Sequence, residues 1–95
     1  MGGEIEVQYN RKIRKQMGPR GWTDALIRGT IRSPTRTGET GDHRTVEGEK
    51  RDDPATAYFR GDGSYVIRND RTNEIVQLSD RNDPDWTPDD RIQMN

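Results

Sequence analysis

Residues 55–79 read ATAYFRGDGSYVIRNDRTNEIVQLS, and their pattern gives the clearest indication of the fold class. Its apolar side chains fall in three runs of six residues, 55–60, 64–69 and 74–79, and the first run alternates Ala or Phe with more polar neighbours. The segments between the runs contain Gly, Asp and Asn, which favour turns. Short strand-like runs joined by short turns predict an antiparallel meander.

Upstream of the meander, Ile5, Tyr9, Ile13 and Met17 recur every four residues. This spacing predicts a helix with a narrow apolar stripe. Gly18-Pro19 is expected to end the helix, because a proline disfavours helical geometry in the residue before it. The chain should then bend before a second helix begins.

The second helix is expected between Thr23 and Ser33-Pro34. Thr23 is a residue type preferred at helix N-caps, and Asp24 suits the positive end of the helix dipole. Gly29 weakens the helix and predicts that it is short. The buried face should consist of Leu26, Ile27, Thr30 and Ile31.

Two segments lack a regular apolar pattern. Residues 33–53 contain no apolar side chain except Val46, which predicts long polar loops around, at most, a short edge strand. The tail from residue 80 to 95 is acidic and interrupted by prolines, and we expect it to lie across the sheet through Trp86. The predicted fold class is therefore α+β, with two N-terminal helices packed on one face of a small antiparallel sheet.

Length and composition limit the possible classes of protein. The chain has 95 residues, of which 26% are hydrophobic and 35% charged, so we expect one small domain, residues 1–95, with a thin core. Residues 1–3 are interpreted as an added start on a fragment of a longer protein. The chain has no cysteine and one histidine, which argues against a disulfide framework or a zinc site. No cofactor, metal or membrane association of the domain is expected.

Charge is distributed unevenly along the chain. The net charge of −1 argues against a non-specific nucleic-acid binder. Residues 1–36, however, carry eight Lys and Arg against three acids, whereas residues 37–95 carry eight against fourteen. Five of the cations, Arg11, Lys12, Arg14, Lys15 and Arg20, lie within ten residues. A solvated helix face and a phosphate-handling active site both explain this density.

A ribonuclease that works without metal must deprotonate a ribose 2′-hydroxyl, stabilise a charged phosphorane and protonate the leaving 5′-oxygen. Arginine binds phosphoryl oxygens with a planar fork, and a lysine crowded by other cations loses its proton more readily. Lys12 and Arg20 meet these requirements if the bend at Gly18-Pro19 folds Arg20 back over the first helix. Aromatic residues such as Trp22 and Tyr58 are either core residues or platforms for RNA bases.

Taken alone, the residues leave several RNA contacts open. His43 lies in a polar segment, where simple exposure is the alternative to a catalytic role, and Arg60 and Arg68 lie on strands with one solvated face. The candidate RNA-binding residues are Arg14, Trp22, Arg36, His43, Arg44, Tyr58, Arg60 and Arg68.

Four separated blocks of the chain are, in order, KIRKQMGPRGWT, DPATAY, SYVIRNDRTNEIVQLSD and DPDWTPDDRIQ. Together and in this order they resemble the ribonuclease domain family of colicin E5, which also occurs at the C-termini of contact-dependent inhibition toxins and other polymorphic bacterial toxins. The likeness extends from about residue 11 to residue 93, but the segment 35–52 aligns poorly, and Lys15 and Pro19 depart from the family pattern.

The resemblance implies a microbial-ribonuclease-like fold and a metal-independent endoribonuclease that cuts the anticodon loops of tRNAs for Tyr, His, Asn and Asp. It implies Lys12 and Arg20 as the catalytic pair and makes His43 unnecessary. It also implies a cognate acidic immunity protein, a monomer when free, and a toxin that leaves the producer cell and acts in the cytoplasm of its target. The alternatives are an mRNA-cutting ribonuclease of the same fold and a non-catalytic RNA-binding module.

Overall fold

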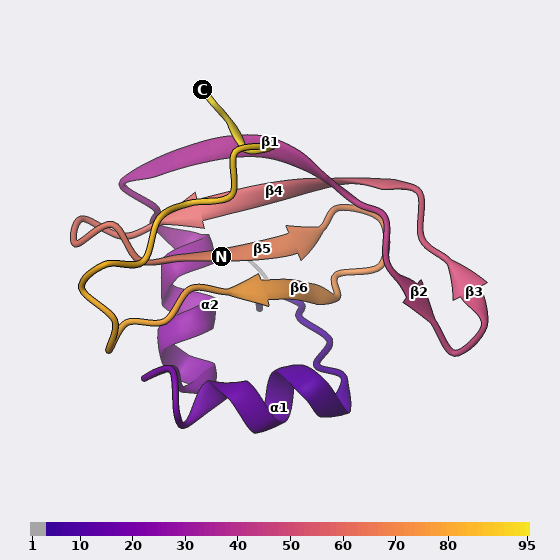
Figure 1. Cartoon of the computed structure of the whole chain (residues 1–95), viewed down its shortest axis with the longest axis horizontal. Helices are drawn as coiled ribbons and strands as arrows, with labels where there is room; N and C mark the ends of the chain where they lie inside the picture. The colour runs from indigo at the N-terminus through magenta and orange to yellow at the C-terminus, as the bar shows by residue number, and fades with distance from the viewer. Residues whose placement is uncertain (1–3) are drawn as a thin grey trace.

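The computed structural model describes residues 4–95, so the interpretation of residues 1–3 falls outside the described part. Two helices precede the strands (Figure 1). The helices are α1 (Arg11–Met17) and α2 (Asp24–Arg32). The strands are β1 (Arg36–Asp42), β2 (Thr45–Val46), β3 (Glu49–Lys50), β4 (Asp53–Phe59), β5 (Tyr65–Asn69), β6 (Ile75–Leu78) and β7 (Gln93–Met94).

Five strands form one antiparallel sheet in the order β6-β5-β4-β1-β7. The meander predicted from residues 55–79 is confirmed as β4, β5 and β6, with Ala57 opposite Ile67 across the first pair. Strands β2 and β3 form a separate hairpin beyond the end of the sheet (Figure 1). The α+β fold class is confirmed.

Apolar side chains cover both faces of the sheet. On one face, Ile13, Ile27 and Ile31 from the helices pack with Val66 and Leu78 from the strands. Helix α1 contacts β6, whereas α2 contacts β4 and β5. Helix packing against one face of the sheet is therefore confirmed, and burying these residues supplies the main driving force for the arrangement.

The opposite face has a second apolar cluster, built from strand residues such as Ala57, Phe59 and Ile67. Trp86 and Ile92 from the C-terminal segment pack against this cluster. The segment runs from the end of β6 back to β1, where β7 pairs with Gly38 and Glu39 (Figure 1). The expectation that the tail lies across the sheet is confirmed.

The first helix is shorter than its apolar spacing predicts. Asn10 is the N-cap, and its side chain accepts a hydrogen bond of 2.8 Å from the Ile13 N–H. Ile5 and Tyr9 lie before this cap, so their prediction as helical residues is wrong. Their segment is extended, with a bridge between Gln8 and Glu74. The Ile5 and Tyr9 side chains still pack against the apolar cluster between the helices and the sheet, which we call the helix core.

The end of the first helix and the whole of the second follow their local signals. Helix α1 stops at Met17, before Gly18-Pro19. The Thr23 side chain accepts from the Leu26 N–H at 3.1 Å and caps α2. Ile27, Thr30 and Ile31 are buried, as predicted, and Leu26 is half-buried.

The prediction of long polar loops in residues 33–53 is wrong. Most of this segment forms β1, which lies inside the sheet between β4 and β7, and the β2–β3 hairpin. Strand β1 packs without apolar residues because Gly38 lets the tail approach closely: a Cβ on Gly38 would lie 2.6 Å from Ile92 Cγ2. Neither described helix is long and apolar enough to cross a membrane.

Candidate active site

A cleft of about 450 Å³ opens on the sheet face away from the helix core. Its floor contains Ile67 and Val76, which belong to the apolar cluster of that face. Helix α1 and the turn after it form one wall, the end of β1 and the β1–β2 connection form another, and the C-terminal segment forms the third. The polar and aromatic side chains that line the cleft are Lys12, Gln16, Arg20, Thr40, His43, Arg44, Gln77, Trp86, Asp89 and Arg91.

Lys12 and Arg20 line the same cleft because of the turn that ends α1. Lys12 and Gln16 share one side of the helix, since residues four apart are neighbours on a helix surface. The Arg20 N–H then donates to the Gln16 carbonyl at 3.0 Å, and the Trp22 N–H donates to the Met17 carbonyl at 2.7 Å. The bend predicted at Gly18-Pro19 thus returns Arg20 to the Lys12 side.

The Arg20 guanidinium is held by two contacts. Its Nη1 donates to the Leu78 carbonyl at 2.6 Å, and its central carbon lies 5.2 Å from the centre of the Trp86 ring. The indole is fixed in turn, because its Nε1–H donates to the Tyr65 hydroxyl at 3.1 Å. Lys12, by contrast, is exposed. Neither Lys12 nor Arg20 forms an ion pair with any carboxylate of residues 4–95.

His43 and Arg44 form the wall opposite α1. The His43 imidazole is largely exposed, and its Nδ1 lies 3.3 Å from Asp52. Its ring also rests on the backbone of Gly41, where a Cβ would lie 2.6 Å from Nε2, so a side chain at position 41 would push the exposed imidazole aside. Arg44 is half-buried and contacts both carboxylate oxygens of Asp42, at 2.8 and 2.9 Å.

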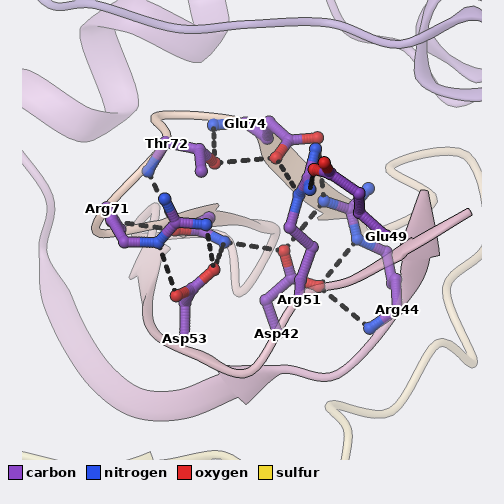
Figure 2. A network of polar contacts seen from close by, with 9 residues as sticks. Asp42, Arg44, Glu49, Arg51, Asp53, Arg71, Thr72 and Glu74 are labelled. Atoms are coloured by element: carbon purple, nitrogen blue, oxygen red, sulfur yellow. Dashed lines mark hydrogen bonds and ion pairs between the residues drawn. The ribbon is translucent and has the colours of Figure 1, made fainter. Parts of the chain in front are cut away.

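Behind that wall lies a polar network, which we call the hairpin network (Figure 2). Arg51 donates to Glu74 at 2.7 Å, and Arg71 donates to Asp53 at 2.6 and 3.1 Å. The network ties β3, β4 and the β5–β6 turn to the end of β1. Its members are Asp42, Arg44, Glu49, Arg51, Asp53, Asn69, Arg71, Thr72 and Glu74.

Two carboxylates of the hairpin network, those of Asp42 and Glu74, are stabilised in their charged form. Burial alone raises the pKa of Asp42, but hydrogen bonds from Arg44 and Asn69 outweigh it and lower that pKa to about 2. The pKa of Glu74 is lowered in the same way: burial raises it, and hydrogen bonds from Arg51 and Thr72 more than compensate. Both carboxylates are therefore ionised at neutral pH, and each of the three arginines of the network has an anionic partner.

Two of the sequence-predicted RNA-binding residues lie beside the cleft and not in it. Arg36 and Arg60 line a neighbouring cavity of about 620 Å³, which shares Trp86 with the cleft. Arg60 also reaches across to Thr30, with its Nη1 3.2 Å from the hydroxyl. The structure therefore brings together Lys12, Arg20, His43 and Arg44 in the cleft, with this pair next to it.

The other four predicted contacts lie elsewhere. Trp22 is buried, donates to the Ser79 carbonyl at 2.7 Å and carries Arg81 over its ring, so it is a core residue with no ring face open to a base. Arg68 stacks on Tyr58 and donates to its hydroxyl at 3.1 Å on the helix side of the sheet. Arg14 stacks over Tyr9, also away from the cleft.

Several lining residues were not identified from the sequence. Gln16 and Gln77 carry neutral amides, and Asp89 and Arg91 form an ion pair of 3.0 Å on the tail wall. Trp86, noted only as an apolar residue of the tail, contributes an aromatic wall. Within residues 4–95, no group of three or more His, Cys, Asp or Glu side chains is arranged to hold a metal ion.

Comparison with known proteins gives consistent matches over nearly the whole chain. The Colicin E5 ribonuclease domain family matches residues 9–91. The chain is 44% identical over 92 residues to Colicin-E5 of Escherichia coli, which covers 92% of this chain and 50% of that protein. It is 40% identical over 92 residues to the tRNA nuclease CdiA of Burkholderia pseudomallei, which covers 93% of this chain and 7% of that protein. The chain thus spans half or less of each relative.

Proposed function

The chain belongs to the colicin E5 ribonuclease domain family, and we therefore propose that it is the RNA-cleaving domain of a bacterial toxin with tRNA as its substrate. One observation carries the proposal: Lys12 and Arg20 line one cleft without a carboxylate partner in the described chain. Cations left unpaired inside a cleft are available to an external polyanion, and a cleft this size admits a nucleotide linkage.

The reaction we propose is a transesterification that needs no metal. The ribose 2′-oxygen attacks the adjacent phosphorus, and the bond from phosphorus to the 5′-oxygen of the next nucleotide breaks. The 2′-hydroxyl proton passes to a base in the cleft, and the leaving oxygen takes up a proton. The products are a 2′,3′-cyclic phosphate and a 5′-hydroxyl end, so atoms and charge balance without an added reactant.

Arg20 and Lys12 have different parts in this reaction. Arg20 is held by Leu78 and Trp86, so its guanidinium presents a preorganised fork to the non-bridging oxygens, where charge grows in the transition state. Lys12 is exposed; in its neutral form it would accept the 2′-hydroxyl proton, and the ammonium that results would neutralise the charge that grows on the phosphate. His43 is not assigned a step.

We propose the anticodon loops of tRNAs for Tyr, His, Asn and Asp as the substrates, cut after the guanine or queuosine wobble base and before U. The name of the Burkholderia relative, a tRNA nuclease, supports this class of RNA. The toxin would act as a monomer in the cytoplasm of a target cell after delivery by its producer. An acidic immunity protein would protect the producer by covering the cleft, and the excess of cations in residues 1–36 would speed its association.

The decisive experiment incubates the purified chain with total bacterial RNA in EDTA and maps new 5′-hydroxyl ends by sequencing. We expect ends within anticodon loops of the four tRNAs, and the same products with or without chelator. If new ends appear only in mRNA, then the substrate is mRNA and not tRNA. RNA binding without any product would favour the non-catalytic module, and loss of cleavage in EDTA would overturn the metal-free reaction.

A further inference from the structure

Strand β6 contains one residue more than its partner requires. Ile67 pairs with Gln77 and Arg68 pairs with Ile75, so Val76 has no partner in β5. This is the arrangement of a β-bulge, which locally shifts which face a side chain occupies. Bulges are frequent beside active sites for this reason.

The bulge places two consecutive side chains of β6 on the cleft side of the sheet. Ile75 and Leu78, on either side of them, are buried in the helix core. Val76 packs against the opposite apolar cluster, and Gln77 lines the cleft with Lys12 and Arg20. With strict alternation, Val76 and Gln77 would lie on opposite faces.

Hydrogen bonding fixes the orientation of the Gln77 amide. The Trp86 indole N–H can only donate, so the Tyr65 hydroxyl accepts from it, at 3.1 Å. The Tyr65 proton is then free to point to Gln77, whose Oε1 lies 3.1 Å away. The amide oxygen therefore faces the fully buried Tyr65, and the amide nitrogen is turned away from it.

The nitrogen of that amide carries two donors, and within residues 4–95 the hydrogen bond that Gln77 makes through its side chain uses the amide oxygen alone. It belongs to a side chain that lines the same cleft as two unpaired cations. A neutral donor there binds an anion without adding to the repulsion between the cations. The feature that matches this set of donors is an oxygen of a phosphodiester.

We propose that Gln77 is a further substrate-contacting residue, whose amide donates to a non-bridging oxygen of the RNA phosphate, and that Tyr65 is the positioning residue that aims it. The inference rests on the proposed ribonuclease function. The Tyr65 hydroxyl positions two of the groups that would contact the phosphate: it orients the Gln77 amide, and it fixes Trp86, over which Arg20 stacks.

Three variants separate the effect of the Gln77 amide donors from the effects of the charge at position 77 and of the orientation of the amide. Gln77→Glu keeps an acceptor for the Tyr65 hydroxyl but replaces the donors with an anion beside Lys12 and Arg20. Gln77→Ala removes the donors and adds no charge, and Tyr65→Phe releases the amide. Matched controls are Gln93→Glu, which makes the same charge change on exposed β7, and Tyr58→Phe, which removes a hydrogen-bonded hydroxyl outside the cleft.

The experiment measures single-turnover cleavage of a synthetic anticodon stem-loop RNA with a guanine wobble base, together with binding of the same RNA carrying a 2′-deoxy group at the cut site. We expect Gln77→Glu to slow cleavage about 100-fold and Gln77→Ala about 10-fold, because a lost charge-assisted hydrogen bond changes a rate by roughly that factor. Tyr65→Phe should slow cleavage about five-fold, with a smaller further loss when it is combined with Gln77→Ala, because the part of its effect that acts through Gln77 is then already absent.

The result that overturns the inference is specific. If wild-type protein cleaves and Lys12→Ala does not, but Gln77→Glu stays within two-fold of the Gln93→Glu control, then Gln77 does not contact substrate and the proposed function stands. If Tyr65→Phe and Gln77→Ala multiply their effects, the positioning role is wrong. Thermal unfolding of each variant shows whether a loss reflects folding. If the wild type cleaves no RNA, the proposed function and this inference both fail.

Discussion

Cationic side chains occupy two regions of this molecule under opposite conditions. In the hairpin network, Arg44, Arg51 and Arg71 each contact at least one carboxylate, so each positive charge is neutralised locally. Around α1, Lys12 and Arg20 contact none within the described chain. The regions have similar side chains but differ in the carboxylates within reach. Pairing with a carboxylate, more than the local density of cations, separates a structural arginine from one that is available to a phosphate.

The largest effect on RNA cleavage is expected for Lys12 and Arg20, the two cations of the cleft that have no carboxylate partner within residues 4–95. Lys12→Ala and Arg20→Ala should each lower the rate of RNA cleavage by about 100- to 1,000-fold, as for removal of one group that stabilises transition-state charge. The free energy of unfolding should change by less than about 0.5 kcal/mol for Lys12→Ala and by about 1 kcal/mol for Arg20→Ala, which loses a hydrogen bond. Cleavage assays and urea unfolding measure both.

Arg32→Ala is the control, because Arg32 is exposed at the end of α2 and has no ion pair in residues 4–95. It should leave cleavage and stability unchanged. If a Lys12→Ala protein keeps more than half of the wild-type rate, then the lack of a carboxylate partner does not identify a functional cation.

In the hairpin network, by contrast, a substitution should mainly lower the free energy of unfolding. Asp42→Ala is expected to lower the free energy of unfolding by about 3 kcal/mol, because it leaves Arg44 and Asn69 without their buried acceptor. Urea unfolding measures this loss. Asp52→Ala is the matched control: its side chain is 61% exposed, and it should change stability by less than about 0.5 kcal/mol. Equal losses in the two variants would show that the network does not stabilise the fold.

Acid should weaken the hairpin network before it affects the unpaired cations. The pKa of Asp42 falls from an ordinary 3.8 to about 2 in the folded chain. A group with a lowered folded pKa adds stability above its unfolded pKa and loses it as pH falls toward the folded value. Stability should therefore drop by about 2 kcal/mol between pH 5 and pH 2 from this group alone. Asp42→Asn should lack that part of the drop, and identical acid profiles would contradict the assignment.

The smallest effect is expected at the rim of α1. Arg11 and Lys15 are exposed and lie beside Lys12 and Gln16 on the helix surface. Their replacement by Ala should raise KM for tRNA about two- to five-fold with an unchanged kcat, because they attract phosphates through solvent. The difference should vanish at high salt, where such attractions are screened. A salt-independent effect would place these residues inside the reaction.

Local sequence patterns were sufficient wherever neighbouring residues alone decide the structure. The meander followed from its turns, and the second helix followed from Thr23 and its apolar face. Lys12 and Arg20 met in one cleft because a single turn joins them. The stripe from Ile5 to Met17 misled because extended residues reached the same core, and Asn10 decided where the helix began.

The features that the sequence patterns did not predict depend on contacts between distant segments of the chain. Strand β1 lacks apolar residues, and it belongs to the sheet because β4 and the tail pair with it. Trp86, Asp89 and Arg91 reach the cleft from a segment without periodicity. Tyr58 and Arg68 looked available on a strand, but the N-terminal segment lies on that side, where Arg68 donates to the Glu6 carbonyl. No single-sequence pattern contains these partners.

The unpaired Val76 also has a consequence for how this protein can evolve. The side chains from Ile75 to Leu78 lie inward, outward, outward and inward, so the loss of Val76 would restore strict alternation and keep Gln77 on the cleft side. A deletion of this one codon should therefore preserve both faces of the sheet. Length changes at this point should be tolerated among functional descendants as long as Gln77 is kept.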